Sequence, residues 1–153
     1  MELKDILSAD MVFAELPARG KKQVLADITA KLTAKMGLDN TDVFELILER
    51  EKLGSTGMGR GIAIPHARIP GLKHIVGAFA QLDTPIEFGS VDDQPVRLVF
   101  MLLAPEKSGA EHLKALSIAS RTLRDRKFCK ELANKQSHDE LYKSLIAQSE
   151  KEG

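Results

Sequence analysis

Two short apolar runs, each bounded by turn-forming residues, constrain the fold of this chain most strongly. They cover residues 74–82 and 96–103. Runs of this length and composition are typical of strands buried in a sheet. Residues Ile62–His66 alternate like a further short strand, with Pro65 near its end, and residues 85–88 are expected to form a short edge segment. The sequence therefore predicts a small central sheet.

Segments with helical spacing precede these runs. Apolar residues recur at steps of three and four from Lys21 to Met36, and Gly37 supplies a stop. A second helix is expected to begin at Asn40 or Thr41, either of which can cap it, and to end near Gly54.

The last third of the chain is also predicted to be helical. Ser108 with Glu111, and Ser137 with Glu140, have the spacing of capping boxes, and Asp125 can cap a short helix between them. The order of two helices, three strands and three helices fits a sheet covered by helices. We therefore expect an α/β fold in a single domain spanning residues 1–153, with mixed strand directions favoured over a purely parallel sheet.

Composition narrows the class of protein. The chain has 153 residues, with 22 Lys and Arg against 22 Asp and Glu, so a non-specific nucleic-acid binder is disfavoured. Its one cysteine, Cys129, excludes an internal disulfide and a cysteine cluster for zinc. Glu2 and Asp5 interrupt any signal-peptide pattern, and the longest apolar run, Leu98–Ala104, is far short of the ~20 residues of a membrane span. We expect a cytoplasmic protein without membrane insertion.

A loop with four glycines, Gly54–Gly61, precedes the short predicted strand. A phosphate-binding P-loop would need Lys and Ser or Thr where Arg60 and Gly61 stand, and it would lie between a strand and a following helix. A nucleotide site is therefore disfavoured. The glycines indicate either a flexible connection with positive φ angles, or a place where the backbone approaches His66 closely.

His66, Arg50 and His112 are the candidate site residues. His66 follows a proline at a strand end beside the glycines, a common place for function. Arg50 ends the second helix, where its stem can cover apolar surface or its guanidinium can grip a phosphoryl group. His112 lies in the first turn of a capped helix. It is either a half-buried histidine bonded to a loop carbonyl or a second imidazole facing His66, and sequence spacing does not decide between these.

The remaining polar features are weaker candidates. His74 and His138 are weaker candidates than His66 and His112, and His138 is expected to be solvated inside its capping box. Cys129 is expected to be a small core or half-buried apolar residue. A basic stretch is interpreted as a solvated helix face or, alternatively, as a docking surface. It comprises Arg121, Arg124, Arg126, Lys127 and Lys130.

The segment Arg50–His66, REKLGSTGMGRGIAIPH, resembles the phosphorylation-site region of the type-2 IIA domains of the bacterial phosphotransferase system, the fructose- and mannitol-type family. Its nitrogen-regulatory branch is the most similar. Further matches are Asp92–Pro95, His112–Ser117 and Ser137–Tyr142, and the similarity runs from about Leu3 to Leu145. Two positions depart from the family pattern. Ala67 stands where glycine is common, which bears on backbone flexibility, and Arg60 stands where asparagine is common, which bears on charge near the site.

The resemblance implies a mixed sheet flanked by helices and a phosphocarrier rather than a stand-alone metabolic enzyme. It implies that His66 accepts a phosphoryl group from an HPr/NPr-type carrier protein, with Arg50 and His112 as the family's arginine and second histidine. No cofactor or metal is required for that step. Potassium transporters and sensor kinases are the implied classes of regulated target. Two alternatives remain open: a sugar-specific IIA component that passes phosphate to a separate IIB protein, and a binding module whose His66 is never phosphorylated.

Overall fold

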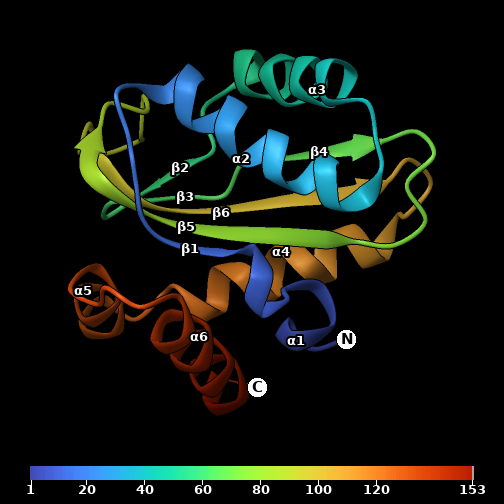
Figure 1. Ribbon diagram of the computed structural model, residues 1–153. Coiled ribbons are helices and arrows are strands. Elements are labelled where there is room, and N and C mark those ends of the chain that lie inside the picture. The colour runs from blue at the N-terminus through green and yellow to red at the C-terminus, as the bar shows by residue number, and fades with distance from the viewer. Residues whose placement is uncertain (153) are drawn as a thin grey trace.

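A mixed sheet lies between two layers of helices in the computed structural model, which describes residues 1–152 (Figure 1). Within these residues the six strands pair in the order β1-β5-β6-β3-β2, and β4 also pairs with β6. β5 and β6 are antiparallel, whereas β3 and β4 run parallel to β6, and β1 runs parallel to β5. The strands are β1 (Val12–Leu16), β2 (Gly57–Gly59), β3 (Ile62–Ala63), β4 (His66–Ile69), β5 (Val76–Ile86) and β6 (Val96–Pro105).

Helices cover both faces of this sheet. Figure 1 shows α2 (Lys21–Met36) and α3 (Asn40–Leu53) on one face. The other face carries α1 (Leu3–Ile6), α4 (Ala110–Thr122), α5 (Arg126–Ala133) and α6 (His138–Glu152), and the short 3-10 helix η1 (Ala9–Met11) leads into β1. The expected mixed α/β fold is confirmed. Within residues 1–152, no helix has both the length and the apolar character needed to cross a bilayer.

Two hydrophobic cores lie on opposite faces of the sheet. The central strand β6 contributes side chains to both, because successive side chains of a strand point to opposite faces. Residues Leu98, Phe100, Leu102 and Ala104 pack with the α4–α6 layer, and Val99, Met101 and Leu103 pack with the α2–α3 layer. A strand buried on both faces is apolar at nearly every position, which explains why its sequence is a continuous run.

Local signals located two helices correctly. The helix predicted over Lys21–Met36 has those bounds, and Gly37 ends it at φ 67°, with its N–H donating to Thr33 O. A side chain would be strained at that left-handed position, which is why the stop is a glycine. Asp125 caps α5 as expected, because its carboxylate accepts from the backbone N–H of Phe128.

The expected cap of α3 is wrong by one residue. The helix begins at Asn40, but the capping side chain is Asp39, which accepts from the backbone N–H of Asp42. Asp39 has an extended backbone, with φ −72° and ψ 116°, whereas Asn40 and Thr41 already lie in the first helical turn. A cap must precede that turn for its oxygen to reach the free N–H groups.

The expected capping box at Ser108 is also wrong. Gly109, at φ 51°, occupies the cap position of α4, so Ser108 lies one residue too early and offers its backbone carbonyl to the N–H of Glu111. At the start of α6 the hydroxyl half of the predicted box is present, since Ser137 Oγ accepts from Glu140 N at 3.3 Å.

The segment Ile62–His66 is not one strand that ends at His66. It contains β3 and the first residue of β4, and both run along the same side of β6. Pro65 has no N–H to donate to the sheet, and Ile64 instead donates its N–H to Thr56 O at 3.1 Å. The interruption places His66 at the beginning of a strand.

Two further strand expectations need correction. Strand β5 continues to Ile86 and takes in the start of the segment 85–88 that was expected to stand apart. Strand β1 was not predicted. It has a register shift between Phe13 and Leu16, and Glu15 between them has φ 52°, so its sequence lacks a clean alternation.

His138 was expected to be solvated, but its ring also contacts β1. Although its side chain is exposed, Nδ1 lies 2.7 Å from Val12 O and the ring packs edge-on against Phe13. The contact ties α6 to β1. Cys129 is buried, as expected, and donates its thiol hydrogen to Leu123 O.

Gln81 joins three segments from within the sheet, and its replacement tests this arrangement. Its Nε2 donates to Leu132 O and Lys135 O at 2.7 and 2.5 Å, and its Oε1 accepts from Glu15 N at 3.0 Å. We predict that Gln81→Leu lowers the free energy of unfolding by about 2–4 kcal/mol, because three backbone groups lose their partner.

Urea denaturation monitored by circular dichroism measures this loss. Gln136→Leu, at an exposed position, is the control and should change the free energy by less than about 0.5 kcal/mol. Equal stabilities of the two variants would contradict the role assigned to Gln81.

Candidate functional site

His66 is the first residue of β4 and is half-buried. Its Nδ1 lies 2.8 Å from Ile64 O. A carbonyl oxygen only accepts hydrogen bonds, so this contact assigns the ring hydrogen to Nδ1. Nε2 then holds the free lone pair and is the nucleophilic nitrogen of the ring.

His112 lies beside His66, although the two are far apart in the chain. The ring centroids are 5.4 Å apart and the ring planes meet at 83°. Of the two interpretations left open by sequence, the imidazole that faces His66 is therefore confirmed. His112 is buried on the face of α4 that also carries the buried small residues Ala115 and Ala119, one and two turns further along the helix.

Arg68 determines which ring nitrogen of His112 carries the hydrogen. The sequence analysis did not identify Arg68 as a residue of the site. Its Nε donates to His112 Nδ1 at 3.2 Å. Since an arginine N–H can only donate, Nδ1 must accept and the ring hydrogen lies on Nε2. Within residues 1–152 this buried Nε2–H has no hydrogen-bond partner. The two histidines thus have opposite tautomers, and the ring beside His66 carries an unused N–H donor.

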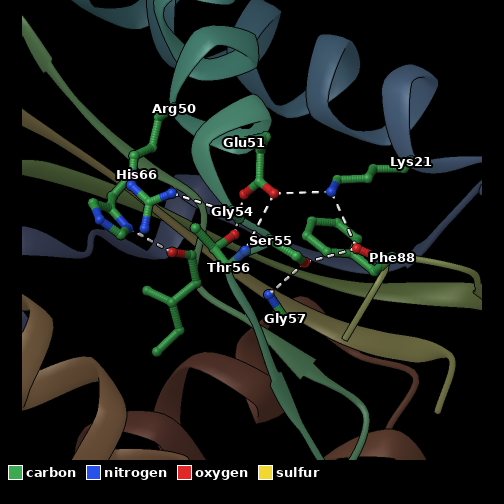
Figure 2. A network of polar contacts seen from close by, with 10 residues as sticks. Lys21, Arg50, Glu51, Gly54, Ser55, Thr56, Gly57, His66 and Phe88 are labelled. Carbon is green, nitrogen blue, oxygen red and sulfur yellow. Dashed lines mark hydrogen bonds and ion pairs between the residues drawn. The ribbon is translucent and has the colours of Figure 1, made fainter. Parts of the chain in front are cut away.

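Arg50 reaches the site from the last turn of α3. Its Nη1 donates to Gly54 O at 2.8 Å, which fixes the guanidinium while leaving most of its N–H groups free (Figure 2). Arg50 and His66 line one cavity of about 370 Å³, which also contains the half-exposed Met58. Arg50 and His66 are therefore neighbours across one cavity.

A buried carboxylate holds the glycine-rich segment in place, as Figure 2 shows. Glu51 accepts from Thr56 N at 3.2 Å and also from the Thr56 hydroxyl. Lys21 of α2 pairs with Glu51 at 2.9 Å and donates to Phe88 O at 3.1 Å. A buried carboxylate is stable only when it is paired and hydrogen-bonded in this way. The segment is therefore a loop held in place by hydrogen bonds and an ion pair rather than a flexible connection.

The loop continues into a hairpin made of β2 and β3. Ser55 Oγ accepts from Gly57 N at 3.0 Å and donates to Phe88 O at 2.7 Å. A Cβ on Gly57 would lie 2.3 Å from Ser90 Oγ, so only glycine fits there. The close backbone approach expected of these glycines does occur, but it is made to Ser90 rather than to His66.

Ala67 and Arg60, the two positions that depart from the family pattern, lie in a strand and in a turn. Ala67 lies in β4 opposite Leu103, in regular strand pairing. Arg60, at φ 58°, forms the turn between β2 and β3, and its Nη1 donates to Arg124 O at 3.1 Å. Its guanidinium lines a different cavity from that of His66, so the added charge expected near the site is placed elsewhere.

Burial lowers the pKa of both histidines. For His66 the main cause is desolvation; the Ile64 carbonyl acts in the opposite direction, and the positive charge of Arg50 lowers the pKa further. For His112, desolvation is again first, and the charges of His66 and Arg68 add to it. Both rings are therefore neutral near pH 7. Within residues 1–152, His, Cys, Asp and Glu side chains form no group of three that could hold a metal ion.

The chain is similar to proteins that are already known. A family model described as the phosphoenolpyruvate-dependent sugar phosphotransferase system, EIIA 2, matches residues 5–148. A nitrogen regulatory protein of Bradyrhizobium diazoefficiens is 45% identical over 145 residues, covering 95% of each chain. The crystal structure of nitrogen regulatory protein IIA-Ntr from Neisseria meningitidis has a TM-score of 0.88 and 35% identity, covering 94% of this chain and 98% of that one. That of IIA mannitol from Escherichia coli has a TM-score of 0.75 and 26% identity, covering 90% and 97%.

The opposite tautomers are directly measurable. We predict that nitrogen NMR of the imidazoles at pH 7 finds the hydrogen of His66 on Nδ1 and that of His112 on Nε2, and that both rings titrate below pH 6.5. In Arg68→Met the donor to His112 Nδ1 is lost, so the His112 tautomer should become mixed while that of His66 is unchanged. A hydrogen on Nδ1 of His112 in the unsubstituted protein would contradict the assignment.

Proposed function

Since this chain belongs to the EIIA 2 family of the phosphotransferase system, we propose that it is a phosphoryl-accepting regulator, phosphorylated on His66 by an HPr/NPr-type carrier protein. The observation that carries the proposal is the histidine pair. A neutral ring with its lone pair on Nε2 lies next to a buried ring with an unused N–H donor.

Transfer is a displacement at phosphorus. The lone pair on His66 Nε2 attacks the phosphorus atom of the carrier's phosphohistidine, and the carrier's P–N bond breaks with its electron pair returning to the carrier's ring. The hydrogen of His66 stays on Nδ1, which donates it to Ile64 O, so no proton has to leave during the step. Such transfers need positioning and charge stabilisation rather than covalent assistance from other residues.

Arg50 and His112 supply the charge stabilisation. The free N–H groups of Arg50 can bind two phosphoryl oxygens at once, which a single ammonium group cannot do. His112 Nε2–H, which lacks a partner in residues 1–152, can donate to a phosphoryl oxygen. Both groups are fixed beforehand, by Gly54 O and by Arg68 respectively, so little reorganisation is needed at the moment of transfer.

Phosphorylation then acts as a charge switch on a rigid scaffold. The phosphoryl group adds nearly two negative charges and three acceptor oxygens at a half-buried position. The contacts of Glu51 hold the loop before His66 in place. We therefore expect phosphorylation to change the surface charge without refolding the domain. The relatives named nitrogen regulatory protein support a role in regulation, and potassium transporters or sensor kinases are the target classes that the resemblance suggests.

A second candidate function is supported by the likeness to IIA mannitol of Escherichia coli. In that case His66 would pass its phosphoryl group to a IIB protein. Mixing the phosphorylated protein with fructose- and mannitol-type IIB domains distinguishes the two functions, because only the second predicts rapid loss of the label from His66.

We predict that incubation with phosphoenolpyruvate, Mg²⁺, enzyme I and the carrier adds one phosphoryl group per chain. The label should be labile in acid and stable in alkali, as a P–N bond is, and His66→Ala should abolish it. His112→Ala is the matched control, since it removes the other imidazole of the pair but should still be labelled, with impairment in a later step. Mass spectrometry of the intact chain measures the stoichiometry. A label on His66→Ala, or one with the stability of a serine ester, would refute the mechanism.

Arg50→Lys should retain the fold but slow phosphorylation by the carrier about tenfold to a hundredfold. This range corresponds to the loss of one charge-assisted hydrogen bond in the transition state. Stopped-flow or quenched-flow measurement of label transfer gives the rate. Arg19→Lys makes the same exchange at an exposed position and should leave the rate unchanged. Equal rates for the two variants would show that Arg50 does not act on the phosphoryl group.

A further inference from the structure

A second cavity, of about 370 Å³, lies where the β2–β3 turn, the start of β6 and α5 meet. Figure 1 shows α5 below the end of the sheet that carries β2 and β3. The residues lining this cavity and those lining the His66 cavity do not overlap. Ile62 pairs with Leu98 and His66 with Leu102, so the two sites are four residues apart along β6, about 13 Å at the usual rise of a strand. We call it the basic cavity.

Positive charge is concentrated in the basic cavity, although the whole chain is neutral. Its cationic lining residues are Arg60, Arg97, Arg124, Arg126 and Lys130. The one carboxylate of the lining, Asp92, is held by the backbone N–H groups of Arg60 and Gln94, at 2.8 and 3.1 Å. Apart from Arg124, which is 3.4 Å from Glu152, these cations form no ion pair within residues 1–152. The cavity thus has an excess of cations, which favours the binding of an anion.

Two of the guanidinium groups are already fixed in position. Arg60 Nη1 donates to Arg124 O at 3.1 Å, and Arg97 Nε donates to Leu82 O at 3.2 Å. Each guanidinium has five N–H donors, so both retain donors for a ligand. Because these side chains are anchored, binding an anion costs them less conformational entropy than it would cost free surface arginines.

Most of the rest of the lining is apolar. The apolar side chains are those of Ile62, Leu98, Leu123, Cys129 and Ala133, and the only other members of the lining are Gly61 and the polar Gln94. An inorganic ion would gain nothing from such a wall. A ligand with a flat apolar body would bury surface against it, and arginine also stacks on aromatic rings. The volume lies within the range of small-molecule sites.

We propose that the basic cavity binds a nucleoside phosphate, with its base against the apolar wall and its phosphates on the arginines. The proposal is independent of phosphorylation at His66. It also accounts for the basic stretch of the sequence, of which Arg124, Arg126 and Lys130 line the cavity while Arg121 and Lys127 do not.

Titration of the isotope-labelled protein with ADP, followed by NMR, tests the proposal. We predict saturable shifts of the amides of Ile62, Leu98 and Ala133. In the double variant Arg126→Gln, Lys130→Gln, ADP binding should weaken at least tenfold. The double variant Arg121→Gln, Lys127→Gln makes the same change in net charge within the same stretch but outside the cavity, and should bind ADP as the unsubstituted protein does.

Adenosine and inorganic phosphate, titrated separately, probe the two halves of the ligand. Both should bind at least tenfold more weakly than ADP. Three results would overturn the proposal: no saturable shift with millimolar ADP, equal weakening in the two double variants, or inorganic phosphate binding as tightly as ADP. The last result would identify a site for inorganic anions, and equal weakening would identify general charge attraction. Thermal melts of both variants establish that each is folded.

Discussion

The pairing of β6 with strands on both of its edges is the constraint on which the rest of the structure depends. One edge pairs with β5 and the other with β3 and then β4. Both faces of β6 are covered, so its side chains link the two hydrophobic cores. The position of His66 follows from this pairing, because the residue is held opposite Leu102. The His66 side chain is thereby carried by a strand that pairs with the centre of the sheet.

Hydrogen bonds to two different neighbours give the two histidines different chemistry. A backbone carbonyl places the hydrogen of His66 on Nδ1, and the arginine donor at Arg68 places that of His112 on Nε2. Burial keeps both rings uncharged near neutral pH, which preserves the lone pair of one and avoids repulsion between them. Two residues with the same side chain thus present a free lone pair in one case and a free N–H donor in the other.

The buried Glu51 links the site to the layer of helices above it. Its carboxylate binds the loop at Thr56, and Lys21 carries the connection to α2 and to Phe88 O. Its negative charge also opposes the lowering of the His66 pKa. The loop that precedes His66 is consequently held by electrostatic contacts as well as by strand pairing.

The sequence by itself determined the features that depend on near neighbours. The periodic helix Lys21–Met36, the run of the doubly buried strand β6 and the Asp125 cap all arise from contacts within a few residues. Arg50 and His66 were also identifiable, because one segment carries both. Near neighbours misled where caps compete, as at Ser108 and Asp39, and where strands are short, irregular or interrupted, as at β1, at Ile62–His66 and at the end of β5.

Only the tertiary structure decided which distant groups meet. Arg68 and His112 are 44 residues apart in the chain, and their contact exists because β4 and α4 both pack on β6. The basic cavity likewise combines the β2–β3 turn with α5. Local periodicity specifies which face of an element is buried, but the partner of that face is chosen by the packing of the whole chain. The tautomers of the histidine pair therefore became visible only in the folded molecule.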